Sequence, residues 1–395
     1  MAAAIFFGDK SCVELFRGLF LKHVFSNKEL SLGFALGCPG LCSTSISAQS
    51  ISSSWMRLGL GRGRTTIKQK PWYIGLISSL VVDNTLKNCG LTADAQVFNR
   101  TAYEAGIPFI PPRAGSAVQR DDVSVPMADG HLNSARLYTP TECDETPLVI
   151  YIHGGGWCLG TALSQPYDSM CSSLCHQLGW RVLSVNYRLA PEHPFPKPVE
   201  DIYDILTWLG DPTSQATVPS AADRDRVVLM GESAGANLAA CASMMWRDRQ
   251  PAGVTVAHQV LFSPCIPTRP LCASRVDPAR ANGAFLPAWL MLWMEKSYAG
   301  PSRSVEDLSR EAYANPLAAE TLAGLPPLTG VVGSAESLRD EGLEFFEAFK
   351  AAGGDAEWRE YEDAYHAFII LPLGDSADAW RYVRERLTAC TTLYG

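Results

Sequence analysis

The chain has 395 residues, of which 47% are hydrophobic and 19% charged, so it can build a large apolar core. This composition excludes disorder, collagen and coiled coil as the overall class, and a net charge of −8 argues against a general nucleic-acid binder. The 12 cysteines are scattered without the paired spacing of zinc ligands. We therefore expect reduced core thiols in an intracellular, cytoplasmic protein, with no metal and no cofactor.

Residues 1–70 differ from the rest of the chain and are predicted to be an extension, either a targeting segment or a poorly ordered one. Residues 1–82 carry nine Lys and Arg against three Asp and Glu. Residues 11–25 have apolar side chains at helical spacing with Arg17 and Lys22 between them. Such a basic amphipathic helix either makes peripheral membrane contact or targets an organelle, or it packs on its own protein. No apolar run is long enough for a transmembrane helix.

Trp72–Val82 is apolar and helix-like, and it could cover an apolar pocket. From about residue 120, short apolar β-branched runs alternate with helical stretches, which predicts an α/β protein with a mainly parallel sheet covered on both sides. The predicted strands are Ser134–Tyr138, Pro147–Ile152, Arg181–Asn186, Arg226–Met230, Val256–Phe262, Leu328–Gly333 and Glu357–Tyr361, and the predicted helices are Pro198–Leu209, Ser233–Trp246, Ser337–Ala352 and Ala377–Thr391.

Residues 265–312 interrupt this alternation with a long segment that includes the apolar run Phe285–Trp293. A connection of this length between two core strands is typical of a functional lid. We expect an apolar pocket here, with Trp157, Trp289 and Trp293 as candidate substrate-binding residues, although each could equally pack inside the cap.

Gly231-Glu232-Ser233-Ala234-Gly235 lies between a predicted strand and a predicted helix. This G-x-S-x-G pattern is typical of a nucleophile elbow, a tight turn that exposes a serine hydroxyl at the positive end of a helix. A second motif, His153-Gly154-Gly155-Gly156-Trp157, directly follows a predicted strand. A glycine run can turn backbone N–H groups toward an oxyanion, so we predict an oxyanion hole from Gly154, Gly155 and Ala234.

Acyl transfer by Ser233 needs a base and an acid, which in this architecture follow the serine in the chain. Only His258 and His366 come after Ser233, and His258 lies inside a strand pattern, so His366 is the predicted base. Glu336, directly after a late strand, is the predicted acid. Its rivals are Asp340, Glu341 and Asp363.

These motifs together resemble the hormone-sensitive-lipase-like carboxylesterases of the α/β-hydrolase superfamily. The resemblance covers about residues 120–395 and includes Tyr187–Pro196, Glu336–Gly342 and His366–Phe368. It implies the α/β-hydrolase fold, with a mostly parallel eight-stranded sheet, a catalytic domain over 122–395 and a helical cap from 71–121 and about 265–312. It assigns Ser233, His366 and Glu336 to a catalytic triad. The family commonly has Asp where this chain has Glu336, and a second glycine where it has Ala236.

The resulting hypothesis is a serine hydrolase that cleaves carboxylic esters of small to medium apolar substrates. The same triad could instead serve a natural-product acyltransferase, a lactonase, a deacetylase or an elimination enzyme. A third hypothesis is a small-ligand receptor that has lost catalysis, and the presence of all three triad residues argues against it. Neither the physiological substrate nor the oligomeric state follows from the sequence.

Overall fold

The computed structural model describes residues 118–142, 146–218, 224–277, 280, 286–370 and 375–394. The predicted N-terminal extension, the amphipathic segment 11–25 and the apolar segment Trp72–Val82 lie outside the described residues. No helix in the described ranges is both long and apolar enough to cross a membrane.

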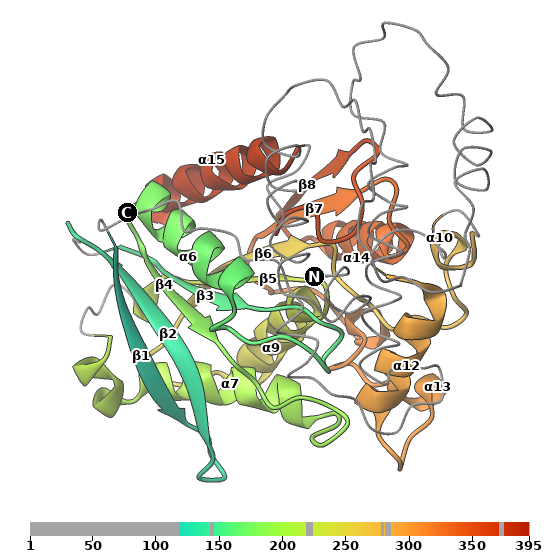
Figure 1. The fold of residues 1–395 in the computed structure, drawn as a ribbon, viewed down its shortest axis with the longest axis horizontal. Helices are drawn as coiled ribbons and strands as arrows, with labels where there is room; N and C mark the ends of the chain where they lie inside the picture. The colour runs from blue at the N-terminus through green and yellow to red at the C-terminus, as the bar shows by residue number, and fades with distance from the viewer. Residues whose placement is uncertain are drawn as a thin grey trace, which may run out of the picture. The chain divides into compact units, whose positions relative to one another are not determined.

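The core is an eight-stranded sheet with the order β1-β2-β4-β3-β5-β6-β7-β8 (Figure 1). Strand β2 runs antiparallel to both of its neighbours, and every other pair is parallel, which confirms the predicted α/β-hydrolase architecture. The strands are β1 Val118–Pro126, β2 Leu132–Pro140, β3 Leu148–Ile152, β4 Arg181–Val185, β5 Val227–Glu232, β6 Val256–Phe262, β7 Leu328–Gly333 and β8 Ala356–Tyr361.

Strand β1 was not among the predicted strands, and it begins four residues before the expected catalytic domain. Its sequence carries charged side chains from Arg120 to Asp122, which are typical of a loop. As an edge strand it is largely exposed, so no continuous apolar run marks it. Its pairing with β2 across nine positions shows that the sheet extends to Val118.

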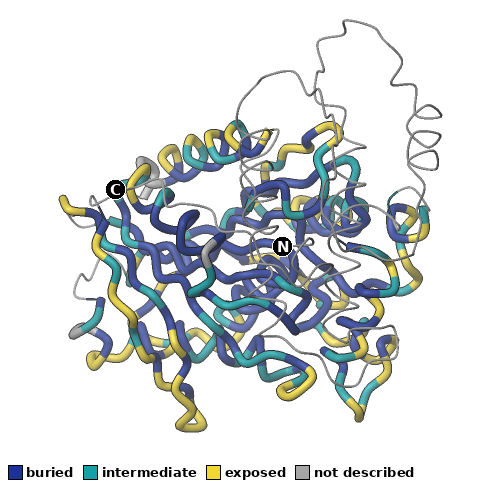
Figure 2. Tube along the Cα trace, in the orientation of Figure 1, coloured by how far each residue is buried: buried dark blue, intermediate teal, exposed yellow. Residues whose placement is uncertain are grey.

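The central strands are buried along their length (Figure 2), and their alternate residues belong to two separate apolar layers. On β3, Leu148 and Ile150 contribute to one layer, whereas Val149 and Tyr151 contribute to the other. Helices α7 Lys197–Gly210, α9 Ala234–Arg249 and α14 Arg339–Ala351 cover the first face, and α6 Gln165–Leu178 and α15 Ser376–Tyr394 cover the second. This two-sided burial explains why the strands read as continuous apolar runs.

Helix α6 was also missed by the sequence analysis, because its sequence begins with Gln165-Pro166 and contains several serines. Its buried face includes Cys171 and Cys175, the pair of cysteines four residues apart. Side chains at this spacing lie on one face of a helix, so the pair reflects core packing.

Asp201 on α7 holds the start of the segment Tyr187–Pro196 through Arg188. The fully buried Asp201 carboxylate accepts hydrogen bonds from the backbone N–H of Arg188 at 2.8 Å and from its guanidinium. Asn133 Nδ2 on β2 donates to the same carboxylate at 3.1 Å. These contacts join β2, α7 and the segment after β4.

In its described residues, the insertion after β6 includes the helices α10 Ala273–Val276, α12 Ala288–Ala299 and α13 Val305–Leu308. It is joined to α14 by a buried ion cluster. Arg275 on α10 is bound by Glu341 on α14 and by Glu295 on α12, with 2.8 Å from Arg275 Nη2 to Glu341 Oε1 and 2.6 Å from Nη1 to Glu295 Oε1. Arg269 also pairs with Glu295. Two cations thus neutralise two buried carboxylates.

We expect Arg275→Met to destabilise the fold by about 3–5 kcal/mol, because two buried carboxylates would share the single remaining cation, Arg269. Without Arg275 the pKa values of Glu295 and Glu341 rise in the folded state, so the native state binds more protons than the unfolded state. The loss of stability should therefore be larger at pH 8 than at pH 5. Urea unfolding at both pH values measures this.

The matched control is Arg310→Met, because Arg310 is mostly exposed and, among the described residues, its side chain forms an ion pair only with Asp307, at 3.6 Å. It should leave the urea midpoint unchanged. An Arg275→Met variant as stable as the wild type would mean that the cluster does not hold the insertion.

Candidate active site

The predicted nucleophile lies on a strained turn between β5 and α9. Ser233 has φ 57° and ψ −122°, a backbone conformation that non-glycine residues rarely adopt. Its N–H donates to Phe262 O at 2.9 Å, and its carbonyl accepts from Cys265 N–H at 3.1 Å. These contacts with the end of β6 fix the direction of the serine side chain.

The two glycines of the motif are required because other backbone atoms occupy the space of a side chain. A Cβ on Gly231 would collide with the carbonyl of Gly235, and a Cβ on Gly235 would collide with the carbonyl of Ile152 at the end of β3. The departure from the family at Ala236 is accommodated, since this alanine is fully buried in the main core.

Ser233, His366 and Glu336 form a continuous hydrogen-bonded chain. The distance from His366 Nε2 to Ser233 Oγ is 3.0 Å, and the distance from His366 Nδ1 to Glu336 Oε2 is 2.7 Å. The three residues follow β5, β7 and β8, so they meet at the carboxyl edge of the parallel strands, where α/β proteins place their ligands. All three are at most 7% exposed.

The loops that carry the base and the acid are joined directly. Ala335 N–H donates to Ala364 O at 3.1 Å, and a Cβ on Gly333 would collide with that same carbonyl. Gly333 therefore lets the histidine loop approach the end of β7. Ala367, next to His366, has a φ of 63°, which turns the chain sharply after the imidazole.

The rival residues are engaged elsewhere. His258 is buried in β6 with Nε2 2.8 Å from Thr329 Oγ1, and burial lowers its pKa to about 3. Glu341 belongs to the ion cluster of the insertion. Asp340 accepts from Ser274 N–H at 2.7 Å, and the backbone N–H of Asp363 bonds to Ser334 Oγ. None of the four bonds to His366 or Ser233 in the described structure.

The electrostatic surroundings of His366 favour its protonated form. Burial by itself lowers the pKa of the imidazole, but the hydrogen bond and negative charge of Glu336 outweigh burial, and the result is a pKa raised above the ordinary histidine value. Glu232, also buried, adds a smaller effect in the same direction. A base in this position is well prepared to hold a proton taken from Ser233.

The glycine-rich loop requires one correction to the predicted oxyanion hole. Gly154 N–H donates to Glu232 Oε1 at 2.7 Å, so it is already occupied. Gly155 and Gly156 have φ values of 111° and 58°, and their N–H groups have no hydrogen-bond partner among the described residues. The structure therefore contradicts Gly154 as a free donor, and it leaves the N–H groups of Gly155 and Gly156 available.

Glu232 is the functional residue that the sequence analysis overlooked. Its carboxylate is buried and accepts from Gly154 N–H and from Tyr167 Oη on α6, both at 2.7 Å. Burial raises the pKa of this carboxyl, and these hydrogen bonds counteract part of the rise. The signal in the sequence was a carboxylate inside an otherwise apolar strand, which must have partners when buried.

The three predicted substrate-binding tryptophans differ in their surroundings. Trp157 is 1% exposed, and its ring stacks on Tyr298 of α12 with centroids 4.4 Å apart, so it packs the insertion against the glycine-rich loop. This is the packing role that the sequence analysis gave as the alternative to substrate binding. Trp293 also belongs to the main core, whereas Trp289 is only partly buried. On the same helix, Met294 lies directly against Gly156.

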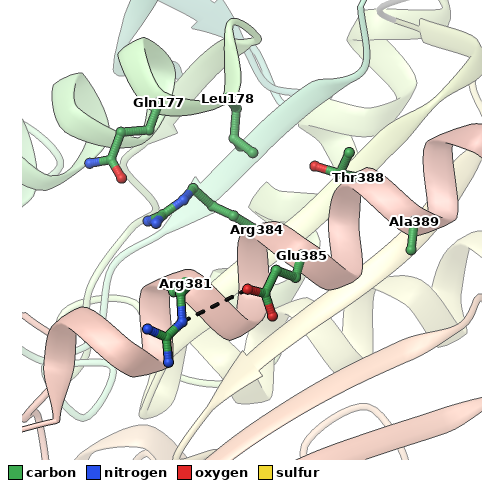
Figure 3. A pocket seen from close by; sticks show the side chains of 7 residues that line it. All are labelled: Gln177, Leu178, Arg381, Arg384, Glu385, Thr388 and Ala389. Carbon is green, nitrogen blue, oxygen red and sulfur yellow. Dashed lines mark ion pairs between the residues drawn. The ribbon is translucent and has the colours of Figure 1, made fainter.

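A groove of about 610 Å³ lies between the end of α6 and α15, away from the triad (Figure 3). Its lining residues are Gln177, Leu178, Arg381, Arg384, Glu385, Thr388 and Ala389, none of which belongs to the triad or the glycine-rich loop. In the described ranges, no group of three His, Cys, Asp or Glu side chains is arranged to hold a metal ion.

Comparison with known proteins agrees with this geometry. The family model described as alpha/beta hydrolase fold matches residues 149–370. The carboxylic ester hydrolase LipN of Mycobacterium tuberculosis is 33% identical over 284 residues, which cover 71% of this chain and 73% of LipN. The 2-hydroxyisoflavanone dehydratase of Glycyrrhiza echinata is 28% identical over 287 residues, covering 67% of this chain and 84% of the dehydratase.

The solved structure of an esterase from Pyrobaculum calidifontis matches with a TM-score of 0.63 at 28% identity, covering 86% of this chain and 98% of that structure. The chain therefore belongs to the alpha/beta hydrolase fold family. The resemblance to hormone-sensitive-lipase-like carboxylesterases that was drawn from its motifs is confirmed.

The raised pKa of His366 predicts how the reactivity of Ser233 depends on pH. Protonated His366 cannot accept the serine proton, so labelling of Ser233 by a fluorophosphonate should slow as the pH falls, beginning above 6.5. In Glu336→Gln the negative charge is lost, the pKa of His366 falls, and this acid limb should move to lower pH. The rate of labelling from pH 5 to 9 is measured for the wild type and for Glu336→Gln. If the rate falls at the same pH in the variant as in the wild type, the coupling between Glu336 and His366 is contradicted.

Proposed function

We propose that the protein is a carboxylesterase-type serine hydrolase that cleaves esters of small to medium apolar substrates. The observation that carries this proposal is the chain of hydrogen bonds from Glu336 through His366 to Ser233 on its strained turn. The ester hydrolases among the relatives support the same reaction class.

In the first step, Ser233 Oγ attacks the ester carbonyl carbon while His366 Nε2 takes the hydroxyl proton. The carbonyl oxygen becomes an oxyanion and accepts hydrogen bonds from the N–H groups of Gly155, Gly156 and Ala234. Collapse of this intermediate breaks the bond to the alcohol oxygen, which leaves with the proton from His366. Glu336 holds the imidazole in the required tautomer and stabilises its charged form throughout.

In the second step, water attacks the acyl-enzyme carbonyl and gives a proton to His366. The same three N–H groups receive the new oxyanion. Its collapse releases the carboxylic acid and returns the proton to Ser233. The residues present account for every proton transfer in both steps.

The insertion supplies the apolar side of the substrate site. Met294 of α12 lies against Gly156, one of the proposed oxyanion donors, and Ser337 Oγ, next to the acid, is 3.3 Å from Met291 Sδ. The thioether of Met294 therefore borders the glycine-rich loop, and that of Met291, about one helical turn earlier, borders the loop that carries Glu336. With the partly buried Trp289 they favour an apolar acyl or alcohol group.

The principal test is hydrolysis of p-nitrophenyl esters from acetyl to palmitoyl. We expect activity with an optimum at short to medium chain length and a fall in kcat/KM of about 10⁴-fold or more in Ser233→Ala. If Ser233→Ala kept the activity of the wild type, the assignment of Ser233 as the nucleophile would be contradicted. A folded wild type without activity on the series would contradict the general esterase function.

Glu232 gives a second test, because it holds the glycine-rich loop rather than the substrate. In Glu232→Ala, Gly154 N–H and Tyr167 lose their acceptor, and the loop is free to turn its donors away from the oxyanion. We expect kcat to fall about 10²-fold, the order of magnitude for a lost oxyanion donor. Glu232→Gln retains an acceptor oxygen and should keep most of the activity. Equal losses in the two variants would contradict this role.

The same triad is compatible with other reactions on related substrates: acyl transfer to an alcohol, lactone opening, deacetylation or elimination. The dehydratase among the relatives makes elimination a specific second candidate. Product analysis with and without an alcohol acceptor distinguishes these reactions. A small-ligand receptor would bind its ligand unchanged, and it would not be expected to keep Ser233 reactive toward a fluorophosphonate.

Peripheral membrane contact through residues 11–25, and an otherwise intracellular location, belong to the same proposal. Liposome flotation of the full chain tests the membrane contact, with Arg17→Glu and Lys22→Glu as charge-reversed variants. Flotation that these substitutions abolish would support the contact, and a chain that stays in solution at low salt would contradict it.

A further inference from the structure

The two oxygens of the Glu336 carboxylate have different partners. Oε2 receives the hydrogen bond from His366 Nδ1, whereas Oε1 accepts from Gly333 N–H and from Ser263 Oγ, both at 2.7 Å. Gly333 belongs to the same chain segment as Glu336, and Ser263 belongs to the neighbouring strand end after β6. Glu336 is 2% exposed, so no bulk water replaces either donor.

A glutamate in this position has one more rotatable bond than the aspartate that the family commonly uses. The additional freedom must be removed for Oε2 to stay directed at His366, because the terminal torsion of a glutamate is broad and weakly restricted. The Gly333 N–H holds one oxygen from one side only. The Ser263 hydroxyl approaches from another strand, and two donors on Oε1 define the plane of the carboxylate.

Ser263 is itself held in place by the backbone. It has a φ of 45°, in the region that favours glycine, and its N–H donates to Val331 O of β7 at 2.7 Å. Two residues later, Cys265 N–H donates to Ser233 O. The short segment after β6 therefore contacts both Ser233, through Cys265, and Glu336, through Ser263. The backbone of Ser263 is fixed independently of its bond to Glu336.

We propose that Ser263 is a positioning residue that fixes the carboxylate of Glu336 toward His366. This inference rests on the proposed triad and adds a fourth residue to it. Ser263 does not touch the reacting atoms, so it acts only through Glu336. Its hydroxyl compensates for the extra methylene of the glutamate.

The first test compares Ser263→Ala with Ser263→Gly. Both remove the hydroxyl, and the glycine also relieves the strained backbone, so it should be the more stable of the two. We expect kcat on p-nitrophenyl esters to fall about 10–100-fold in both, the range found for residues that orient the ligands of a metal, with KM unchanged. Recovery of activity in the glycine variant would show that backbone strain, and not the hydroxyl, mattered, and would overturn the proposal.

The second test is a double-mutant cycle with Glu336→Asp. The shorter aspartate cannot reach both Ser263 and His366, so adding Ser263→Ala in this background should change kcat by less than about 2-fold. A structural role of Ser263 would instead give the same loss in both backgrounds, which would overturn the proposal. Ser243→Ala is the matched control, because Ser243 is fully buried and, within the described part of the chain, its hydroxyl bonds only to Ala239 O of α9.

The labelling rate of Ser233 by a fluorophosphonate separates this inference from the proposed function. It reports the activation of Ser233 without an ester substrate. Slower labelling in Ser263→Ala supports the positioning role even if no ester in the series is hydrolysed. Wild-type labelling and wild-type turnover in Ser263→Ala would overturn the role and leave the esterase function intact.

Discussion

The hydrogen bond from Gly154 N–H to the buried carboxylate of Glu232 joins the two loops on which the site depends. One loop follows β3 and carries the oxyanion donors; the other follows β5 and carries Ser233. A buried carboxylate is costly unless it is hydrogen-bonded, so the burial of Glu232 favours an arrangement in which the glycine-rich loop lies against the nucleophile turn. Tyr167 adds a second donor from α6, on the opposite side of the sheet from α9.

This arrangement uses steric and polar constraints together. Gly235 lets the nucleophile turn approach the end of β3, because any side chain there would meet the carbonyl of Ile152. Glu232 accepts the hydrogen bond of the Gly154 N–H, and the loop then turns at Gly155 and Gly156, which both have a positive φ. The donors proposed for the oxyanion are therefore oriented before any substrate binds, which is the condition for electrostatic stabilisation of a transition state.

The acid side of the site follows the same logic with different residues. Glu336 is fixed by donors from its own loop and from the end of β6, and the base loop is fixed by a backbone bond between Ala335 and Ala364. The insertion closes over this edge through α12, and its attachment to α14 depends on the buried Arg275. The candidate triad and the attachment of the insertion thus depend on the same set of strand ends.

The sequence by itself determined the class of fold, the triad candidates and the existence of an insertion. Apolar runs of the right length predict buried parallel strands, and the order of Ser233, Glu336 and His366 along the chain, each after a strand, follows from how such a sheet places its loops. These features are local in sequence, so a single chain is enough to find them. The edge strand β1 was missed because it is largely exposed and shows no continuous apolar run. Helix α6 was missed because its sequence begins with Gln165-Pro166 and contains several serines.

Only the tertiary structure decided which hydrogen-bond donors and side chains of the motifs already have partners within the protein. It assigned Gly154 N–H to Glu232, placed Trp157 in a stack with Tyr298, and brought Ser263 to Glu336 across 73 residues. A hydrogen-bond donor serves one acceptor well, and which acceptor it meets depends on the packing of distant segments. Motifs therefore indicate candidate reactive residues. The residues that contact and orient them can be recognised only once the strand ends have come together in the fold.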